Sequence, residues 1–241
     1  MSSEKTRDCI ESLSSSEEND PSEQLADEDT RPRVTPESII MNLFQCLFSD
    51  NDYGKSNYWD DRYKEKNELY EWFLSWPEIF PQIKDFILLP VRKCLNIGCG
   101  NSPMSSDMLA NDIKHIVSID ISPIVIEQMR ERYKDPNLSF HVMDCRNLSF
   151  AENEFDMVVD KGTIDALYCM KDPNENIEQS IKQISNVLIP TKQYISISLG
   201  SPEQRKDFID IYSKYFTLQN TVSIKNPNNN QKVHYVYIFK K

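Results

Sequence analysis

The sequence predicts an α/β protein in which helices cover both faces of a mostly parallel sheet. From residue 93 onward, β-rich apolar runs alternate with segments of helical character. The last two β-rich runs are joined only by the Asn-rich turn at residues 226–230, which is too short to hold a helix. We therefore expect seven strands, the last two of which form an antiparallel hairpin at one edge.

The elements follow one another in a regular order. The expected strands lie near residues 93–98, 115–120, 138–143, 155–160, 193–199, 215–224 and 232–240. The expected helices lie near residues 103–111, 122–134, 162–170, 174–189 and 202–214. A helix between two strands returns the chain to the same end of the sheet, so the early strands should run parallel.

The N-terminal part has a different composition. Residues 1–33 are acidic and Ser-rich with few large apolar side chains, and we expect a disordered tail. Thr35 and Pro36 are a helix start signal, and apolar residues follow at helical spacing over 39–48. The sequence thus predicts a tail at 1–33, a helix and linker at 34–56, and one folded domain at 57–241.

A glycine-rich turn follows the first expected strand. Gly98 and Gly100 are two of only five glycines in the chain, and they are separated by one residue. Asp120 ends the next strand 20 residues later, the interval typical of a carboxylate that binds ribose hydroxyls. An ordinary strand–turn–helix unit with a surface Asp is the alternative. The pair of features favours a nucleotide-type cofactor.

The details of the turn narrow the choice of cofactor. The dinucleotide pattern needs a third glycine, and Pro103 stands at that position. The sequence also lacks the glycine-rich Lys-Ser/Thr loop that cradles phosphates. Both observations disfavour NAD, FAD and nucleoside triphosphates, and suit S-adenosylmethionine, which has no pyrophosphate.

Two further carboxylates lie at strand ends. Asp144 follows the third strand with Cys145 after it, and Asp160 ends the fourth strand before Lys161. Ligands of open α/β sheets bind outside the carboxyl ends of the strands. Seven strands with a terminal hairpin are the outline of the class I (Rossmann-like) methyltransferase fold. In this fold the Asp144 position faces the adenine, and the backbone N–H at the Cys145 position reaches a ring nitrogen.

Aromatic residues precede the domain's first strand. Trp59, Tyr63 and Trp72 are spaced so that they could lie near one helical face. One interpretation is an amphipathic helix that packs its aromatic rings into the core. The other is a lid over the glycine turn, with Trp59 stacked on the cofactor and the Tyr63 hydroxyl bound to the cofactor carboxylate.

Composition limits the classes of partner and site. The tail at 1–30 carries a net charge of −8 out of −11 for the whole chain, so the rest is nearly balanced and a nucleic-acid surface is not expected. No apolar run is long enough to span a membrane. Cysteine spacing predicts neither a zinc site nor a disulfide framework. We expect a soluble, cytoplasmic monomer without a metal.

Several segments together resemble one family. They are Tyr58-Trp59, Arg62-Tyr63, Glu71-Trp72-Phe73, Gly98 to Ser102, Ile119 to Ser122 and, most specific of all, Asp160-Lys161-Gly162-Thr163-Ile164-Asp165-Ala166. They are similar to those of the seven-strand protein-lysine methyltransferases that act on elongation factor 1-alpha, together with the relative that acts on citrate synthase. The resemblance covers about residues 57–240, and the acidic tail argues against the citrate synthase branch.

The resemblance implies the fold, the activity, the cofactor S-adenosylmethionine and a protein substrate, elongation factor 1-alpha. The residues that it implies to contact the cofactor are Trp59, Tyr63, Trp72, Gly98, Gly100, Asp120, Ile121, Asp144, Cys145 and Lys161. The chain departs from the family at Pro190-Thr191-Lys192, where Pro-Gly-Gly is usual, and at Asn111-Asp112, where a glycine is usual. Both departures put local turn geometry in doubt.

The expected chemistry is an in-line displacement, in which a neutral lysine amine attacks the methyl group of a sulfonium. Alignment of the reacting atoms supplies most of the rate. Asp160 is the candidate to attract and orient the amine, although a carboxylate also favours the charged form of lysine. Two alternatives remain open: a class I methyltransferase for another protein, a small molecule or RNA, and a non-catalytic cofactor-binding module.

Overall fold

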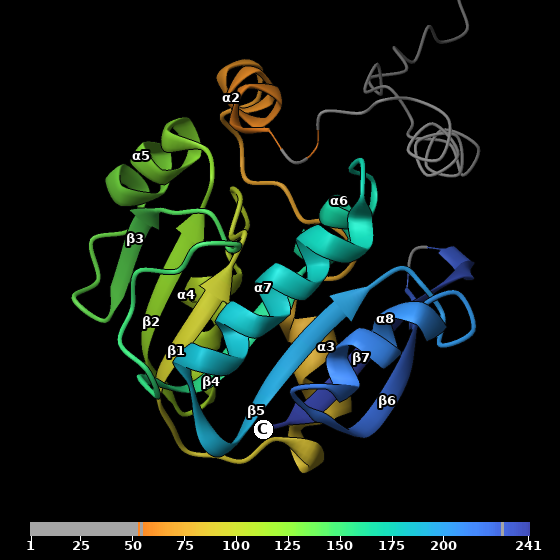
Figure 1. Ribbon diagram of the computed structural model, residues 1–241. Helices are drawn as coiled ribbons and strands as arrows, with labels where there is room; N and C mark the ends of the chain where they lie inside the picture. Colours follow the sequence, from red (N-terminus) through yellow and green to blue (C-terminus); the bar gives the residue numbers. More distant parts are fainter. Residues whose placement is uncertain (1–52, 54, 228) are drawn as a thin grey trace, which may run out of the picture.

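The computed structural model describes residues 53, 55–227 and 229–241, which form a single seven-stranded sheet between two layers of helices (Figure 1). The strand order is β3-β2-β1-β4-β5-β7-β6. The strands are β1 (Val91–Ile97), β2 (Ile113–Asp120), β3 (Leu138–Val142), β4 (Phe155–Lys161), β5 (Leu188–Ser198), β6 (Thr217–Asn226) and β7 (Asn229–Lys240). All seven expected strands are confirmed.

The pairing of the strands also agrees with the prediction. β1 pairs in parallel with β2 and β4, β2 with β3, and β4 with β5, whereas β7 is antiparallel to both β5 and β6. The chain order reverses between β1 and β4, and a ligand crevice is expected outside the carboxyl ends at such a point. The glycine turn follows β1 directly at this switch point.

Two layers of helices bury the two faces of the sheet. In chain order the α-helices are α2 (Ser56–Glu65), α3 (Trp76–Ile83), α4 (Met104–Met108), α5 (Pro123–Arg132), α6 (Thr163–Tyr168), α7 (Pro173–Val187) and α8 (Lys206–Ser213). Short 3₁₀ turns, η1 (Lys84–Phe86) and η2 (Leu109–Asn111), follow α3 and α4.

The core consists of two apolar clusters, one on each face. The first joins the sheet to α3, α4 and α5 through side chains such as Ile79, Met104 and Ile126. The second joins it to α6, α7 and α8 through side chains such as Ile181 and Phe208. Parallel strands covered on both faces need apolar residues on both, which explains their nearly continuous apolar sequences.

The helix α3 was not predicted. Ser75 and Glu78 form a capping box at its start, where the Glu78 carboxylate accepts hydrogen bonds from the backbone N–H and the hydroxyl of Ser75, and Pro77 occupies the first turn. This Ser-x-x-Glu pattern with an early Pro is a helix start signal that the sequence contains. Trp72 precedes the helix, so it shares no helical face with Trp59 and Tyr63 on α2.

The two departures from the family pattern occur where the backbone is left-handed. Asp112 has φ 59° and Thr191 has φ 70°. The expected turn at 190–192 is instead an irregular part of β5, where the register with β4 shifts and the N–H of Thr191 donates to the carbonyl of Lys241. The helix α7 accordingly ends at Val187, two residues earlier than predicted.

The expected tail (1–33) and most of the expected helix and linker (34–56) lie outside the described residues. Among the described cysteines, Cys94, Cys99 and Cys145 are free and buried. Cys169 is disulfide-bonded, which the cysteine spacing did not predict. Within the described part of the chain, no helix is both long and apolar enough to cross a membrane.

Candidate active site

The glycine turn after β1 has a conformation that requires glycine. Gly98 has φ 62° and Gly100 has φ 51°, both in the left-handed region that other residues avoid. A Cβ atom on Gly98 would lie 2.1 Å from the Thr163 hydroxyl, which itself donates to the carbonyl of Ile97 at 2.9 Å. A Cβ on Gly100 would lie 2.9 Å from the Tyr63 hydroxyl. The turn therefore presents backbone rather than side chains at the crevice.

Asp120 is fixed beside this turn. One carboxylate oxygen accepts the N–H of Gly100 at 2.9 Å and the other accepts the N–H of Ser122 at 3.0 Å. The side chain is at the end of β2 and the residue is only 7% exposed. Burial raises the pKa of Asp120 to about 6, although the two N–H donors oppose that shift. Each oxygen keeps acceptor capacity for a further donor, as a ribose-binding carboxylate requires.

The aromatic residues gather next to the turn. Tyr63 is buried in α2, and its ring stacks on Trp59 with a centroid separation of 6.0 Å. The Trp72 ring meets Trp59 edge-on at 6.4 Å, although the two residues lie on different segments. The guanidinium of Arg62 lies over Trp72 at 4.8 Å. The structure thus brings the three predicted aromatic residues together.

Polar contacts tie α2 to the start of α5. The Ser122 hydroxyl, at the N-cap of α5, donates to the Asp60 carboxylate on α2. The Gln128 side-chain amide donates to the backbone carbonyl of Tyr63 at 2.9 Å. These bonds position the aromatic residues over the glycine turn and beside Asp120, and neither Asp60 nor Gln128 was identified from the sequence.

Lys161 is at the centre of a buried polar cluster. Its ammonium group contacts the Glu71 carboxylate and donates to the carbonyl of Leu74 at 3.3 Å and the Ser102 hydroxyl at 3.5 Å. The Ser102 hydroxyl also donates to Glu71. Burial lowers the pKa of Lys161, while the carboxylate of Glu71 raises it. Lys161 therefore fastens the segment between α2 and α3 to the end of β4.

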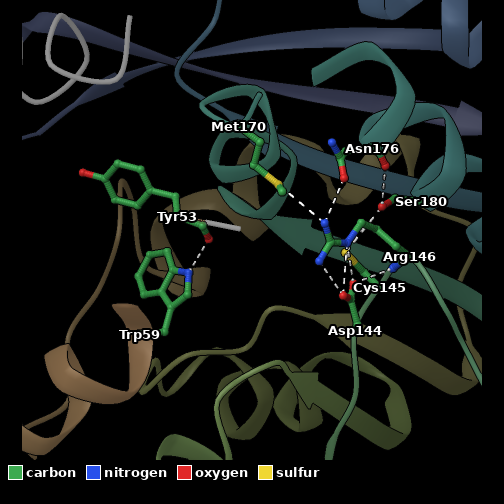
Figure 2. A network of polar contacts seen from close by, with 8 residues as sticks. All are labelled: Tyr53, Trp59, Asp144, Cys145, Arg146, Met170, Asn176 and Ser180. Atoms are coloured by element: carbon green, nitrogen blue, oxygen red, sulfur yellow. Dashed lines mark hydrogen bonds and ion pairs between the residues drawn. The ribbon is translucent and has the colours of Figure 1, made fainter. Parts of the chain in front are cut away.

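Asp144 belongs to another network, shown in Figure 2. Arg146 pairs with both oxygens of the Asp144 carboxylate, at distances of 2.6–3.0 Å. The same guanidinium donates to the side-chain oxygen of Asn176 on α7 at 2.8 Å. These bonds lower the pKa of Asp144 despite its partial burial. The Cys145 thiol and the Ser180 hydroxyl are 3.5 Å apart.

Asp160 lies on the opposite face of the sheet from Asp120. Its carboxylate is 0% exposed and accepts from the Tyr194 hydroxyl at 2.6 Å and the N–H of Ile164 at 3.3 Å. Burial raises the pKa of Asp160 to about 6. Asp160 therefore supports the start of α6 from within the core, where it interacts electrostatically with Cys145 but lies on the other face of the sheet from Asp120.

The arrangement fits a cofactor with an adenosine and an amino-acid end. The glycine turn needs the absence of a Cβ at two positions, and the buried Asp120 follows β2 in the manner of a ribose-binding acid. Ile121 follows Asp120 directly and is partly exposed. Among the described residues, no group of three or more His, Cys, Asp or Glu side chains could hold a metal ion.

Comparison with known proteins supports this interpretation. Residues 91–240 match the model of a methyltransferase domain family. The chain belongs to this family. The predicted enzyme class, a methyltransferase, is thereby confirmed.

Curated relatives refine the grouping. The chain is 32% identical to EEF1A lysine methyltransferase 4 of Mus musculus over 73% of its own length and 70% of the relative. It is 34% identical to the Bos taurus protein of the same name, over 64% of each chain. It is 30% identical to the Homo sapiens eEF1A lysine and N-terminal methyltransferase, of which the match covers only 24%. The family resemblance seen in the sequence is confirmed.

Solved structures show the same fold. The N-methyltransferase NodS of Bradyrhizobium japonicum, in complex with S-adenosyl-L-homocysteine, aligns over 83% of this chain with a TM-score of 0.55 and 19% identity. A putative methyltransferase of Haloferax volcanii, in complex with the activator Trm112, aligns over 79% with a TM-score of 0.60 and 13% identity. The predicted class I methyltransferase fold is confirmed.

Proposed function

We propose that this chain is a protein-lysine N-methyltransferase that transfers a methyl group to a lysine ε-amine of translation elongation factor 1-alpha. The observation that carries the proposal is the match at 30–34% identity to relatives whose names state this substrate and this reaction. The geometry is consistent with it, since the glycine turn and Asp120 meet at the topological switch point.

The geometry of the glycine turn and Asp120 supports the proposed cofactor contacts, and the family resemblance supplies the others. S-adenosylmethionine, when bound, supplies a methyl group on a positively charged sulfur. Asp120 accepts hydrogen bonds from the ribose hydroxyls, next to the glycine turn and Ile121. Asp144 and the N–H of Cys145 face the adenine, with the Asp144 carboxylate held in place by Arg146. The remaining part of the cofactor, its amino-acid end, is surrounded by Gly98, Gly100, Trp59, Tyr63, Trp72 and Lys161.

The enzyme must also bind the substrate lysine with its ε-amine in the neutral form. Lysine has an ordinary pKa of about 10.4, so only a small fraction is neutral at pH 7. A site screened from water disfavours the charged ammonium and shifts this balance. Alignment of the amine with the methyl group then supplies the larger share of the acceleration, for which effective molarities correspond to roughly 7–11 kcal/mol.

Asp160 has a positioning role in this proposal. Its buried carboxylate accepts the N–H of Ile164 and thereby holds the start of α6, beside Lys161 and Gly162. The earlier hypothesis that Asp160 attracts the amine directly is not favoured by a carboxylate that is 0% exposed and bound to Tyr194. A direct role predicts loss of kcat in Asp160→Asn at every pH, whereas a positioning role predicts a changed pH dependence of stability with kcat near the wild-type value.

The proposal is tested by incubating the purified chain with elongation factor 1-alpha and S-adenosylmethionine and locating added methyl mass by peptide mass spectrometry. Methyl on one lysine, absent with a Gly98→Arg variant, is the expected result. Cofactor binding in calorimetry without methyl transfer would point to a different substrate. The absence of both methyl transfer and cofactor binding would overturn the proposal. The cytoplasmic location, the monomeric state and the lack of nucleic-acid binding stay predictions.

A further inference from the structure

A buried histidine packs against the segment between α2 and α3 and has an unpaired polar atom. His234 is on β7, and the residue is 2% exposed. Its Nδ1 atom has no hydrogen-bond partner among the residues that the structure describes. Buried polar atoms are nearly always paired, so an unpaired one requires an explanation. A ligand that supplies the missing partner is one such explanation.

A continuous row of contacts joins this histidine to the cofactor turn. Thr163 packs where a side chain on Gly98 would stand. Gly162, the residue before Thr163, packs against the Phe73 ring. A Cβ atom on Gly162 would lie 3.1 Å from the nearest atom of that ring. The Phe73 ring in turn faces the His234 imidazole, with a centroid separation of 5.5 Å. His234 is therefore connected through Phe73 to the turn between β4 and α6, and this turn packs against the glycine turn.

Phe73 covers the histidine from a segment without regular structure, between α2 and α3. Its φ of 67° is in the left-handed region, which is unfavourable for a bulky residue. The neighbours Glu71 and Leu74 are both bound by Lys161, so the backbone is fixed on each side of Phe73. Strained residues held in this way are concentrated at ligand clamps and switch regions.

Three charged groups interact electrostatically with His234. Lys232 on β7 is cationic, whereas Glu78 on α3 and Asp165 on α6 are anionic. Burial and, next, the charge of Lys232 lower the pKa of His234 to about 4, while the two carboxylates oppose that shift. The imidazole is therefore neutral at pH 7, and a neutral imidazole has one nitrogen that accepts a hydrogen bond.

We propose that Phe73 and His234 form the acceptor-lysine pocket, in which Nδ1 of His234 accepts a hydrogen bond from the lysine ε-amine and Phe73 covers His234 until the lysine enters. The proposal rests on the proposed function. The bond to Nδ1 uses an N–H of the amine and leaves the nitrogen lone pair free to face the methyl group. His234 is thus a positioning residue for the amine, and Phe73 supplies an apolar wall for its methylene chain.

The first test compares His234→Leu and His234→Gln with the wild type, using elongation factor 1-alpha as substrate. We expect KM for the protein to rise about tenfold in His234→Leu, the effect of one lost hydrogen bond of about 1.4 kcal/mol. Partial recovery is expected in His234→Gln, which keeps an acceptor. The dissociation constant of S-adenosylmethionine should stay within twofold. His115→Leu, a substitution of an exposed histidine early in β2, is the matched control.

A wild-type KM in His234→Leu would overturn the assignment of Nδ1. An inactive wild type would instead contradict the proposed function, and a second measurement then decides the inference alone. The His234 Nδ1 resonance is followed by NMR in labelled protein with S-adenosylhomocysteine while n-butylamine, a mimic of the lysine side chain, is added. A saturable shift, absent for His115, supports the pocket, and no shift overturns it.

The cover is tested by chemical modification in the full chain. Diethyl pyrocarbonate should modify the buried His234 slowly in the wild type and at least fivefold faster in Phe73→Gly, while His115 reacts equally in both. Glycine removes the ring and accepts the left-handed backbone without strain, so the variant should fold. An unchanged rate at His234 would show that Phe73 does not control access.

Discussion

The contact between the glycine turn and α6 yields a prediction that can be worked out from the structure. In Gly98→Ala the new methyl group would lie 2.1 Å from the Thr163 hydroxyl, and the alanine would have to adopt φ 62°. The left-handed conformation costs about 1–2 kcal/mol for a residue with a Cβ. Moving Thr163 away also removes its hydrogen bond to the carbonyl of Ile97, which is worth about 1 kcal/mol. We expect a destabilisation of about 2–3 kcal/mol.

A double-mutant cycle in urea, with cofactor affinity measured by calorimetry, checks this reasoning. Thr163→Ala alone loses the hydrogen bond and should cost about 1 kcal/mol. In the double variant the contacts with the Thr163 hydroxyl and methyl group are gone, a tight contact of 3.0 Å with its Cβ remains, and the bond is lost only once, so the total should stay near 2–3 kcal/mol rather than reach the sum of about 3–4 kcal/mol. Strict additivity of the two changes would refute the proposed close approach of Gly98 and Thr163.

Three further predictions concern backbone strain and buried carboxylates. Thr191→Gly should raise the free energy of unfolding by about 0.5–1 kcal/mol in urea, because Thr191 is left-handed at φ 70°, and a lower value would contradict this. Cofactor affinity should fall below about pH 6 as Asp120 becomes protonated, since it then loses acceptor capacity, and calorimetry between pH 5 and 8 shows whether the loss occurs. Burial raises the pKa of Asp160 from 3.8 to about 6, so the folded state binds the extra proton and the stability from this group is lost as the pH rises between these values. The side chain in Asp160→Asn can still accept a hydrogen bond from Tyr194. Its free energy of unfolding should therefore rise relative to that of the wild type by up to about 3 kcal/mol as the pH increases from 3.8 to about 6. Curves of unfolding free energy against pH that stay parallel for the two proteins would contradict the raised pKa.

The order of strands and the cofactor turn were predictable because their signals are local. Alternating apolar runs, two glycines at one turn and a carboxylate 20 residues later are all properties of short segments. The unpredicted contacts are formed between segments distant in sequence. Glu71 meets Lys161, and Arg146 meets Asn176, across separations of 90 and 30 residues. Spacing gave no signal for either pair.

The usual glycines of the family show a different limit of sequence analysis. A missing glycine at Asp112 and Thr191 raised doubt about the turns, yet the chain keeps the left-handed backbone at both positions with ordinary residues. At Asp112 the short polar side chain tolerates this conformation. At Thr191 the strand contacts around it, including the bond from its N–H to Lys241, hold the backbone in place. The fold therefore imposes the local geometry where the residue alone would not choose it.

The register of the strands explains why Asp120 and Asp160 lie on opposite faces of the sheet. Ile97 on β1 is paired with Ile119 on β2 and with Asp160 on β4, so these three side chains share one face of the sheet. Asp120 is one residue beyond Ile119 and points to the other face, as Lys161 does beyond Asp160. A shift of one residue exchanges the faces of a strand. The sequence places Asp120 and Asp160 at the same edge, but only the register shows that Asp120 and Lys161 share one face of the sheet whereas Asp160 lies on the face beneath α7 and α8.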